Sequence, residues 1–314
     1  MTDRPEISVV IPCYNEEANA AQIAAAVIAE LEKVTDSFDI IFIDNASTDR
    51  TVDIIRKLCA TDPRVRLIVN TRNFGQMRSP THAVFAARGQ AVIGMCADFQ
   101  DSPQLLPDFV RRWRAGARIV LGVREEGRST FVFGSLRRLF YWVSRKVGEY
   151  PIIPNATGFG LYDRRVVDAM ASMKEPEPFM RGMLVETGYS IDIITYPRPG
   201  RLRGVSKNNL VTLLDFALSG LASSAKNLIR LPFLVAFLCG LFVVLSLVGA
   251  VIALIVGGNV AFWLIMGAVE LQFAMLFGFL GLIGDQVRLV SERTRGTPLV
   301  VERERVNFPA GDGR

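Results

Sequence analysis

ISVVIPCYNEE, residues 7–17, joins a buried-type strand to a polar turn, and a segment rich in Glu and Ala follows it. This order predicts a strand over 7–11 and a helix over about 17–33. The order recurs, with strands predicted at 40–44, 65–69, 91–95 and 118–123 and helices at 48–60, near 80–88 and from Pro103. Strands that alternate with helices of this length indicate an α/β fold with a mainly parallel sheet and right-handed crossovers.

Several element boundaries and later elements can also be predicted. Ser47 or Thr48 could cap the helix at 48–60, and Pro103 suits the first turn of its helix. Further along, the pattern predicts helices at 136–147 and 164–173 and strands at 159–162 and 191–196. The stretch 297–308 could add a strand or form a loose basic tail.

Two uninterrupted apolar runs, 233–256 and 260–284, follow the α/β region. Each is longer than the roughly 20 residues that cross a bilayer as a helix, so the pair predicts a transmembrane hairpin. The amphipathic stretch before them predicts a helix in the membrane interface, with an ordinary core-facing helix as the alternative. We therefore expect a catalytic domain at 1–205, an interfacial helix at 206–230, the hairpin at 231–285 and a C-terminal tail at 286–314.

Charge and cysteine content set the expected location. The net charge is +5, and Arg and Lys flank the apolar runs on both sides. By the positive-inside rule, we expect an integral inner or cell membrane protein with both termini and the catalytic domain in the cytoplasm. The same cations suit lipid headgroups or a lipid phosphate, so we expect a bilayer and no nucleic acid as partner. The four cysteines form no CxxC pair, and the first residues show no signal-peptide pattern.

Ligands of open α/β sheets bind at the carboxyl ends of the strands, and polar residues follow two of the predicted strands there. After the first strand, Tyr14, Asn15 and Glu16 could stack on and hydrogen-bond a nucleobase and ribose, or could simply cap the following helix. After the second, Asp44 could hold a base or ribose, or could cap its own turn.

The third strand end, GMCADFQDSP at 94–103, contains oxygen ligands at alternate positions. Asp98 and Gln100 would point to one side of an extended segment and could share Mg²⁺ or Mn²⁺. Such a cation would bridge the diphosphate of a nucleotide sugar and neutralise the leaving group. The alternative is a capped helix start, and both interpretations hold together if Asp101 or Ser102 is the cap.

The ordered set of motifs resembles glycosyltransferase family 2, in particular the polyisoprenyl-phosphate glycosyltransferases related to dolichyl-phosphate mannose synthase and the bacterial bactoprenol glucosyltransferases. The resemblance covers nearly the whole chain. Its motifs are PCYNEE (12–17), DNASTDRT (44–51), TRNFGQ (71–76), ADFQDSP (97–103), GVRE (122–125), RG (181–182), RLRGVSK (201–207), the apolar hairpin and SERTRGTP (291–298).

The resemblance implies a Rossmann-like GT-A catalytic domain and assigns residues to it. Nucleotide-binding positions would be Pro12, Tyr14, Asn15, Glu16, Asp44, Asn45, Arg72, Asn73 and Ala97. The metal ligands would be Asp98 and Gln100, and the catalytic residues would be Asp98, Arg124 and Arg201. Phosphate ligands of the acceptor would be Arg124, Arg138, Arg201, Ser206 and Lys207.

Three positions depart from the family pattern. Cys96 stands where relatives usually carry the first aspartate of DADLQD, and cysteine is a poor ligand for hard cations. Asn45 replaces a frequent second aspartate, and TGFGL (157–161) stands where many relatives have GDFRL. These changes put the sugar preference in question.

The reaction expected from the resemblance is inverting transfer of a sugar from a nucleotide sugar to a polyprenyl phosphate. That acceptor is largely dianionic at pH 7 and needs no general base, in keeping with a chain whose one histidine, His82, we assign to packing or a helix surface. Two alternatives stay open: a transferase with another membrane or polysaccharide acceptor, and a catalytically impaired membrane scaffold. A homo-oligomer is also possible.

Overall fold

The computed structural model describes residues 4–125, 153, 156–197 and 296–309, with scattered helical positions between 265 and 294. Within these residues eight strands form one sheet in the order β7-β5-β6-β4-β1-β2-β3-β8. The strands are β1 (Ile7–Cys13), β2 (Phe38–Asp44), β3 (Val65–Asn70), β4 (Ala91–Gly94), β5 (Ile119–Arg124), β6 (Ala156–Asp163), β7 (Ile191–Tyr196) and β8 (Glu302–Val306). The helices are α1 (Ala20–Leu31), α2 (Thr51–Thr61), α3 (Gly75–Ala86), the 3-10 helix η1 (Pro103–Leu105), α4 (Leu106–Arg114), α6 (Arg164–Ser172) and α7 (Met180–Glu186).

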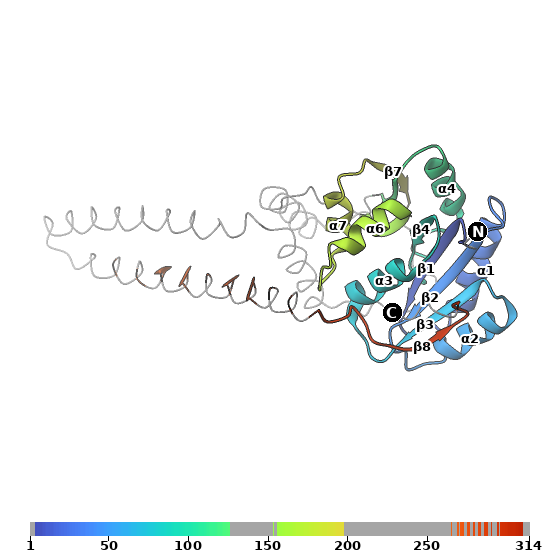
Figure 1. Ribbon diagram of the computed structural model, residues 1–314, viewed down its shortest axis with the longest axis horizontal. Helices are drawn as coiled ribbons and strands as arrows, with labels where there is room; N and C mark the ends of the chain where they lie inside the picture. The colour runs from blue at the N-terminus through green and yellow to red at the C-terminus, as the bar shows by residue number, and fades with distance from the viewer. Residues whose placement is uncertain are drawn as a thin grey trace, which may run out of the picture.

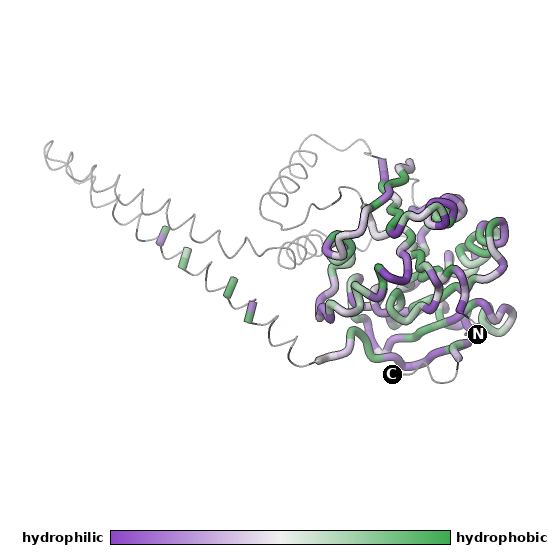
Figure 2. Tube along the Cα trace, turned by 45° about the horizontal axis from the view of Figure 1, so that its top comes forward, coloured by the Kyte–Doolittle hydropathy of each residue, from purple (hydrophilic) through white to green (hydrophobic). Residues whose placement is uncertain are grey.

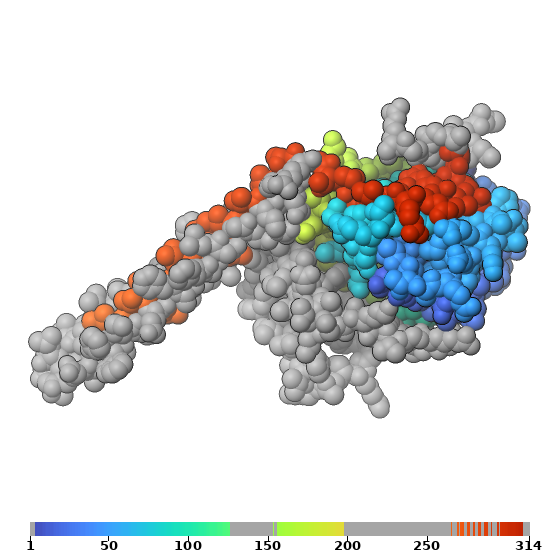
Figure 3. All heavy atoms as spheres, turned by 90° about the horizontal axis from the view of Figure 1, so that it is seen from below, coloured from blue at the N-terminus to red at the C-terminus, as the bar shows by residue number. Residues whose placement is uncertain are grey.

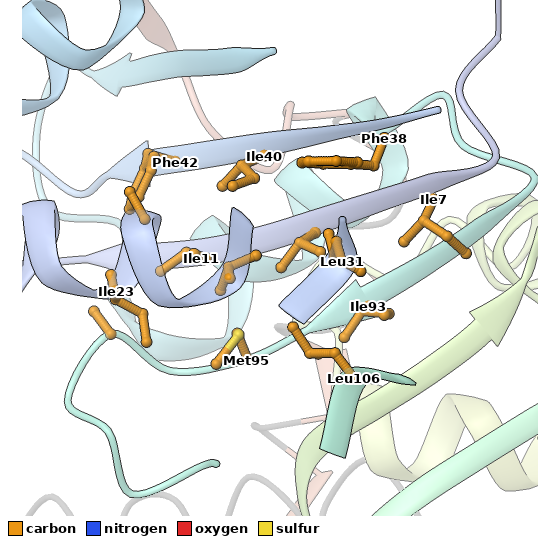
Figure 4. Packing of buried hydrophobic residues seen from close by; sticks show 14 of the residues in the cluster. Ile7, Ile11, Ile23, Leu31, Phe38, Ile40, Phe42, Ile93, Met95 and Leu106 are labelled. Carbon is orange, nitrogen blue, oxygen red and sulfur yellow. The ribbon is translucent and has the colours of Figure 1, made fainter. Parts of the chain in front are cut away.

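Helices cover both faces of the sheet (Figure 1). Side chains alternate along a strand, so Ile40 and Phe42 of β2 pack with α1, α2 and α4, whereas Ile41 and Ile43 pack with α3, α6 and α7. Figure 4 shows the first of these clusters between the strands and α1. Each fully buried side chain of this size contributes roughly 1.5–3 kcal/mol to folding, so these two layers fix the sheet that positions the site.

The centre of the sheet is parallel, as the strand–helix alternation predicts. Strand β1 pairs in parallel with β2 and β4, and β2 pairs in parallel with β3. Strand β6 lies antiparallel between β4 and β5, where a Cβ at Gly160 would overlap the carbonyl oxygen of Val120. The prediction of an α/β fold with a mostly parallel sheet is confirmed.

Strand β8 settles the choice left open for residues 297–308, because it adds to the sheet antiparallel to β3. It is a largely hydrophilic strand at the rim (Figure 2), and Figure 3 shows the C-terminal segment lying against α3. Arg78 Nη2 donates to the carbonyl of Pro298 at 2.7 Å, and His82 is hydrogen-bonded to Glu302. His82 is thus half-buried on α3 and joins this helix to β8 through Glu302, which agrees with the structural role expected for it.

The starts or caps predicted for three helices differ from the structure. Helix α2 begins at Thr51, and its first N–H donates to the Asp49 carboxylate at 3.0 Å, so neither Ser47 nor Thr48 is its cap. Helix α3 begins at Gly75, earlier than predicted, because Pro80 is accommodated inside it. The helix after the ADFQD motif does begin with Pro103 in its first turn, as expected, but it has no side-chain cap.

The membrane predictions fall mainly on residues that lie outside those described. The interfacial helix (206–230), the first span (233–256) and the helix at 136–147 lie there completely, as does most of the second span (260–284). Among the positions that are described, no helix is long and apolar enough to cross a membrane.

Candidate functional site

The loops that follow β1, β2 and β4 meet at one edge of the sheet, because these strands are parallel neighbours. Cys13 pairs with Asp44, so β1 and β2 end at the same level, whereas β4 ends opposite Val10 and its loop continues past that point toward the same edge. In open α/β sheets this carboxyl edge is where ligands bind. The structure thus brings the predicted nucleotide-binding and metal-binding segments together.

Asn15 joins the first two loops. Its backbone is in the left-handed region, with φ of 57°, which asparagine tolerates better than most residues. Its N–H donates to the hydroxyl of Ser47 at 2.8 Å, and its side-chain oxygen accepts from the Thr48 N–H at 2.8 Å. Asn15 therefore shapes the loop, while its neighbour Tyr14 is 39% exposed and presents a ring to the solvent side.

Asp44 is buried at the end of β2, where its carboxylate accepts from the backbone N–H of Ser47 at 2.9 Å and from the Ser47 hydroxyl. Burial raises the pKa of Asp44, and the hydrogen bonds from Ser47 oppose that rise. The turn-capping interpretation of this residue is confirmed. A role in nucleotide binding stays a prediction for Asp44, as it does for Pro12 and Glu16.

Asn45 uses its whole amide group to hold the loop after β3. Its Nδ2 donates to Asn73 Oδ1 at 2.8 Å and to the Gly75 carbonyl at 3.2 Å. Its Oδ1 accepts from the Phe74 N–H at 2.8 Å and from Asn70 Nδ2 at 3.2 Å. Asn45 thus positions the loop rather than offering its amide to a ligand.

Arg72 lies at the exposed side of that loop. Its guanidinium carbon stands 4.0 Å from the centre of the Phe74 ring, and Nη1 donates to the Asn73 carbonyl at 3.2 Å. This cation–π contact keeps a positive charge at the carboxyl edge of the sheet, where a phosphate could meet it.

The loop after β4 turns sharply through the ADFQD motif. Asp98 Oδ1 accepts from the Gln100 N–H at 3.2 Å, and Phe99 has a φ of 59°. Ala97 and Gln100 are buried, whereas Asp98 is half-buried. Asp98 and Gln100 are therefore close neighbours on one turn.

Asp101 does not cap the following helix, contrary to one sequence prediction. Its side chain is buried and accepts from Arg124 Nη2 at 2.8 Å, from the Tyr196 hydroxyl at 2.8 Å and from the Cys96 N–H at 3.2 Å. Hydrogen bonds from three donors, one of them a charged guanidinium, stabilise this carboxylate more than a capping interaction at a partly exposed helix start would. Sequence reasoning noticed Asp101 but gave it the wrong partner, and it offered no signal at all for Tyr196.

Arg124 stands at the end of β5 and faces the ADFQD loop. Its Nη1 donates to Gln100 Oε1 at 3.0 Å, and only 13% of the side chain is exposed. Burial alone would lower the pKa of this guanidinium, but the hydrogen bond to Asp101 raises it above its ordinary value. Arg124 is therefore a fixed positive charge beside the two predicted metal ligands.

The loop after β4 supplies only part of the oxygen ligands that a hard divalent cation needs. Asp98 and Gln100 supply a carboxylate and an amide oxygen, which Mg²⁺ and Mn²⁺ accept. Asp101 is committed to Arg124 and Tyr196. In the described part of the chain no group of three or more His, Cys, Asp or Glu side chains could hold a metal ion. A cation here would need further oxygens from a bound diphosphate.

Cys96 takes part in this loop through its backbone N–H, which donates to Asp101, and its thiol stays uncharged. Burial raises the pKa of the Cys96 thiol well above its usual range, and the nearby Asp101 carboxylate adds to the rise. The thiol is therefore neutral, and the position where the family resemblance places an aspartate adds no charge to the loop. The predicted acceptor residues Arg138, Arg201, Ser206 and Lys207 lie outside the described residues.

Comparison with known proteins gives a consistent result. A family model described as glycosyl transferase family 2 matches residues 8–172. A bactoprenol glucosyl transferase of Shigella phage SfX is 32% identical over 312 residues, which cover 96% of this chain and 99% of the relative. A prophage bactoprenol glucosyl transferase homolog of Escherichia coli (strain K12) is 35% identical over 223 residues, covering 69% and 72%. Among solved structures, glucosyl-3-phosphoglycerate synthase from Mycobacterium tuberculosis has a TM-score of 0.49 and 18% identity, and the match covers 69% of this chain and 76% of that one.

Proposed function

We propose that this chain, which belongs to glycosyl transferase family 2, transfers a sugar from a nucleotide sugar to a polyprenyl phosphate, with inversion at the anomeric carbon. The meeting of Asp98, Gln100 and Arg124 at the carboxyl edge of the sheet carries this proposal. The acceptor class is supported by the relative named a bactoprenol glucosyl transferase, which matches along nearly the whole chain.

Donor binding would use the four loops that follow β1, β2, β3 and β4 at the carboxyl edge. Tyr14 would stack on the base, Asp44 would hold the base or ribose, and Arg72 would approach the diphosphate. Asp98 and Gln100 would hold Mg²⁺ or Mn²⁺ together with diphosphate oxygens. When bound, the cation supplies positive charge against the departing nucleoside diphosphate.

The acceptor would be aligned by cations of the chain. A polyprenyl phosphate is a dianion at pH 7 and is itself the nucleophile, so no side chain has to remove a proton. Arg124, with Arg201 and the Ser206-Lys207 pair that the family resemblance assigns, would orient its phosphate for in-line attack on the anomeric carbon. Catalysis is then positioning and electrostatic stabilisation.

The lipid acceptor agrees with the apolar sequence at 233–256 and 260–284, which we propose forms a membrane hairpin. The described helical positions in and just after the second run support this. Large apolar side chains there are exposed, from 38% at Val269 to 61% at Val287. Apolar side chains in such number need lipid or a partner to cover them.

Incubation of the full-length chain with polyprenyl phosphate, Mn²⁺ or Mg²⁺ and a panel of radiolabelled nucleotide sugars tests the proposal. We expect one label to enter the organic phase as a sugar linked through phosphate to the lipid. Label in a polysaccharide or in a phosphate-free lipid would indicate a different acceptor. Absence of both transfer and nucleoside diphosphate binding would indicate a scaffold instead.

A further inference from the structure

Tyr196 lies beside Arg124 across two neighbouring strands. Strands β5 and β7 run parallel, Arg124 and Tyr196 are partners in their register, and the Glu125 N–H donates to the Tyr196 carbonyl at 2.9 Å. Strand β7 is at the edge of the sheet (Figure 1). Register partners in a parallel pair point to the same face, so the backbone fixes the two side chains side by side.

A closed ring of hydrogen bonds joins Tyr196, Asp101 and Arg124. The Tyr196 hydroxyl donates to Asp101 Oδ1 at 2.8 Å and accepts from Arg124 Nε at 3.2 Å. Arg124 Nη2 donates to the same Asp101 oxygen at 2.8 Å. Each member thus restrains the other two, and the guanidinium plane has one orientation.

The ring leaves Arg124 ready for a phosphate. A guanidinium has five N–H donors, and described residues take three of them: Tyr196, Gln100 and Asp101. One N–H remains on each terminal nitrogen. The two terminal nitrogens of an arginine can together bind phosphate oxygens in a bidentate arrangement.

The hydroxyl of Tyr196 is held in place by packing. The residue is buried, and its ring meets the Phe159 ring edge-on at 5.5 Å between centroids. Burial and the Asp101 carboxylate raise the pKa of this hydroxyl, so it stays protonated and donates. Tyr196 is 3% exposed and its hydroxyl is used by Asp101 and Arg124, so an effect of this residue on sugar transfer would pass through Arg124.

We propose that Tyr196 is a positioning residue for sugar transfer: with Asp101, it orients the Arg124 guanidinium so that its two remaining N–H groups meet the acceptor phosphate. The inference rests on the function proposed above and names the residue that sets acceptor alignment. Strand β7 is followed closely in sequence by residues 201–207, to which the family resemblance assigns phosphate ligands of the acceptor. The strand that orients Arg124 therefore leads into that segment.

A double-mutant cycle between Tyr196→Phe and Arg124→Gln tests this inference. We expect Tyr196→Phe to lower kcat/KM for polyprenyl phosphate about tenfold and Arg124→Gln to lower it about a hundredfold. If Tyr196 acts through Arg124, the double variant is no slower than Arg124→Gln alone, within about twofold. The KM for the nucleotide sugar should change by less than about twofold in Tyr196→Phe.

Two measurements separate positioning from a general loss of structure. Tyr189→Phe makes the same change at an exposed tyrosine just before β7 and should leave the kinetics as in the wild type. In the absence of nucleotide and metal, Tyr196→Phe should weaken binding of polyprenyl phosphate severalfold, whereas Tyr189→Phe should not. Should Tyr196→Phe fail to give folded protein, Asp101→Asn takes its place in the cycle, because it removes the other restraint on Arg124.

The positioning role would be overturned if the decreases in kcat/KM of the two single variants multiplied in the double variant, or if Tyr196→Phe had wild-type kinetics. Either result would leave the proposed function intact. A wild-type chain that forms no sugar–lipid with any donor would overturn both. The two failures are therefore distinguishable.

Discussion

Asn45 lies at the carboxyl edge of the sheet, where ligands are expected to bind, but its side chain holds the neighbouring loop in place. All its amide capacity goes to residues 70–75, which contain the predicted nucleotide contacts Arg72 and Asn73. A carboxylate at this position has the same shape but no N–H donor, so the geometry of the loop depends on the amide.

Asn45→Asp should therefore destabilise the protein by roughly 1–3 kcal/mol, because a carboxylate would face two acceptor oxygens, Asn73 Oδ1 and the Gly75 carbonyl. Asn73→Asp is the matched control, since Asn73 uses its Oδ1 only as an acceptor from Asn45 and the Gly75 N–H. We expect the control to change the free energy of unfolding in denaturant by less than about 0.5 kcal/mol. Equal losses in both variants would contradict this account of the loop.

Asp98 carries the strongest catalytic prediction at this scale. Asp98→Ala should slow sugar transfer about 10²–10³-fold, equivalent to roughly 2–4 kcal/mol of barrier, while the melting temperature stays close to that of the wild type. Asp108→Ala, which removes an exposed carboxylate of α4, should leave the rate within about twofold. Undiminished sugar–lipid formation by Asp98→Ala would remove this residue from the site.

Sequence reasoning located the site loops but not all the contacts within them. Asp98 and Gln100 are close neighbours, but they lie on a turn in which Phe99 has a φ of 59° and not on the extended segment that their spacing predicted. The partners of Asp101 could not be predicted, because Arg124 and Tyr196 reach it from strands 23 and 95 residues away. A local rule for helix caps gave the wrong answer where tertiary contacts were stronger.

At the scale of elements, β8 is the unexpected contributor. It lies at the sheet edge beside β3, and Thr71 donates from both its N–H, at 2.9 Å, and its hydroxyl, at 3.1 Å, to the Val301 carbonyl. Glu302 accepts from Arg305 Nη2 at 2.7 Å and is paired with His82. The segment that follows the two apolar runs in sequence is thus attached to the loop that begins with Thr71 and to α3.

The Glu302 pairs predict a pH dependence of stability. Burial alone would raise the pKa of this carboxyl, but Arg305 and His82 hold it at about 2. A lowered pKa stabilises the fold fully above the ordinary value of 4.5, and the stabilisation is lost as the pH falls toward 2. Wild type and Glu302→Gln should therefore differ in melting temperature at pH 5, and this difference should shrink as the pH falls toward about 2.

Glu304→Gln is the control, because the Glu304 carboxylate pairs with Arg56 on the surface and such pairs contribute less than about 1 kcal/mol. A difference between wild type and Glu302→Gln that persisted unchanged at pH 2 would show that the carboxylate charge is not what stabilises β8.

The elements themselves were predictable to different degrees. Strands β1, β2, β3 and β7 have clear apolar patterns, and their predicted positions agree with the structure to within two residues at each end. The start of α3 was not predictable, because Pro80 usually ends a helix and here lies inside one. Strand β8 reads ERERV, and only its pairing with β3 distinguishes it from a charged tail.

At the scale of the whole molecule, the fold gathers the loops predicted to bind a nucleotide sugar at one edge of an α/β sheet, and we propose that this edge lies next to a bilayer. The chain belongs to glycosyl transferase family 2, and Cys96, whose thiol is neutral, stands where the family resemblance places an aspartate. The remaining oxygens are enough for a cation only if the donor diphosphate completes its coordination. Donor binding and metal binding should therefore be inseparable.

Calorimetric titration of the full-length chain with UDP, GDP, ADP and CDP, each with Mn²⁺ and with EDTA, measures this dependence. We predict that one of the four nucleotides binds at least about tenfold more tightly with Mn²⁺ than with EDTA, and that Asp98→Ala abolishes the difference. Binding that is equally tight with Mn²⁺ and with EDTA, or that is unchanged in Asp98→Ala, would contradict a cation-assisted donor site.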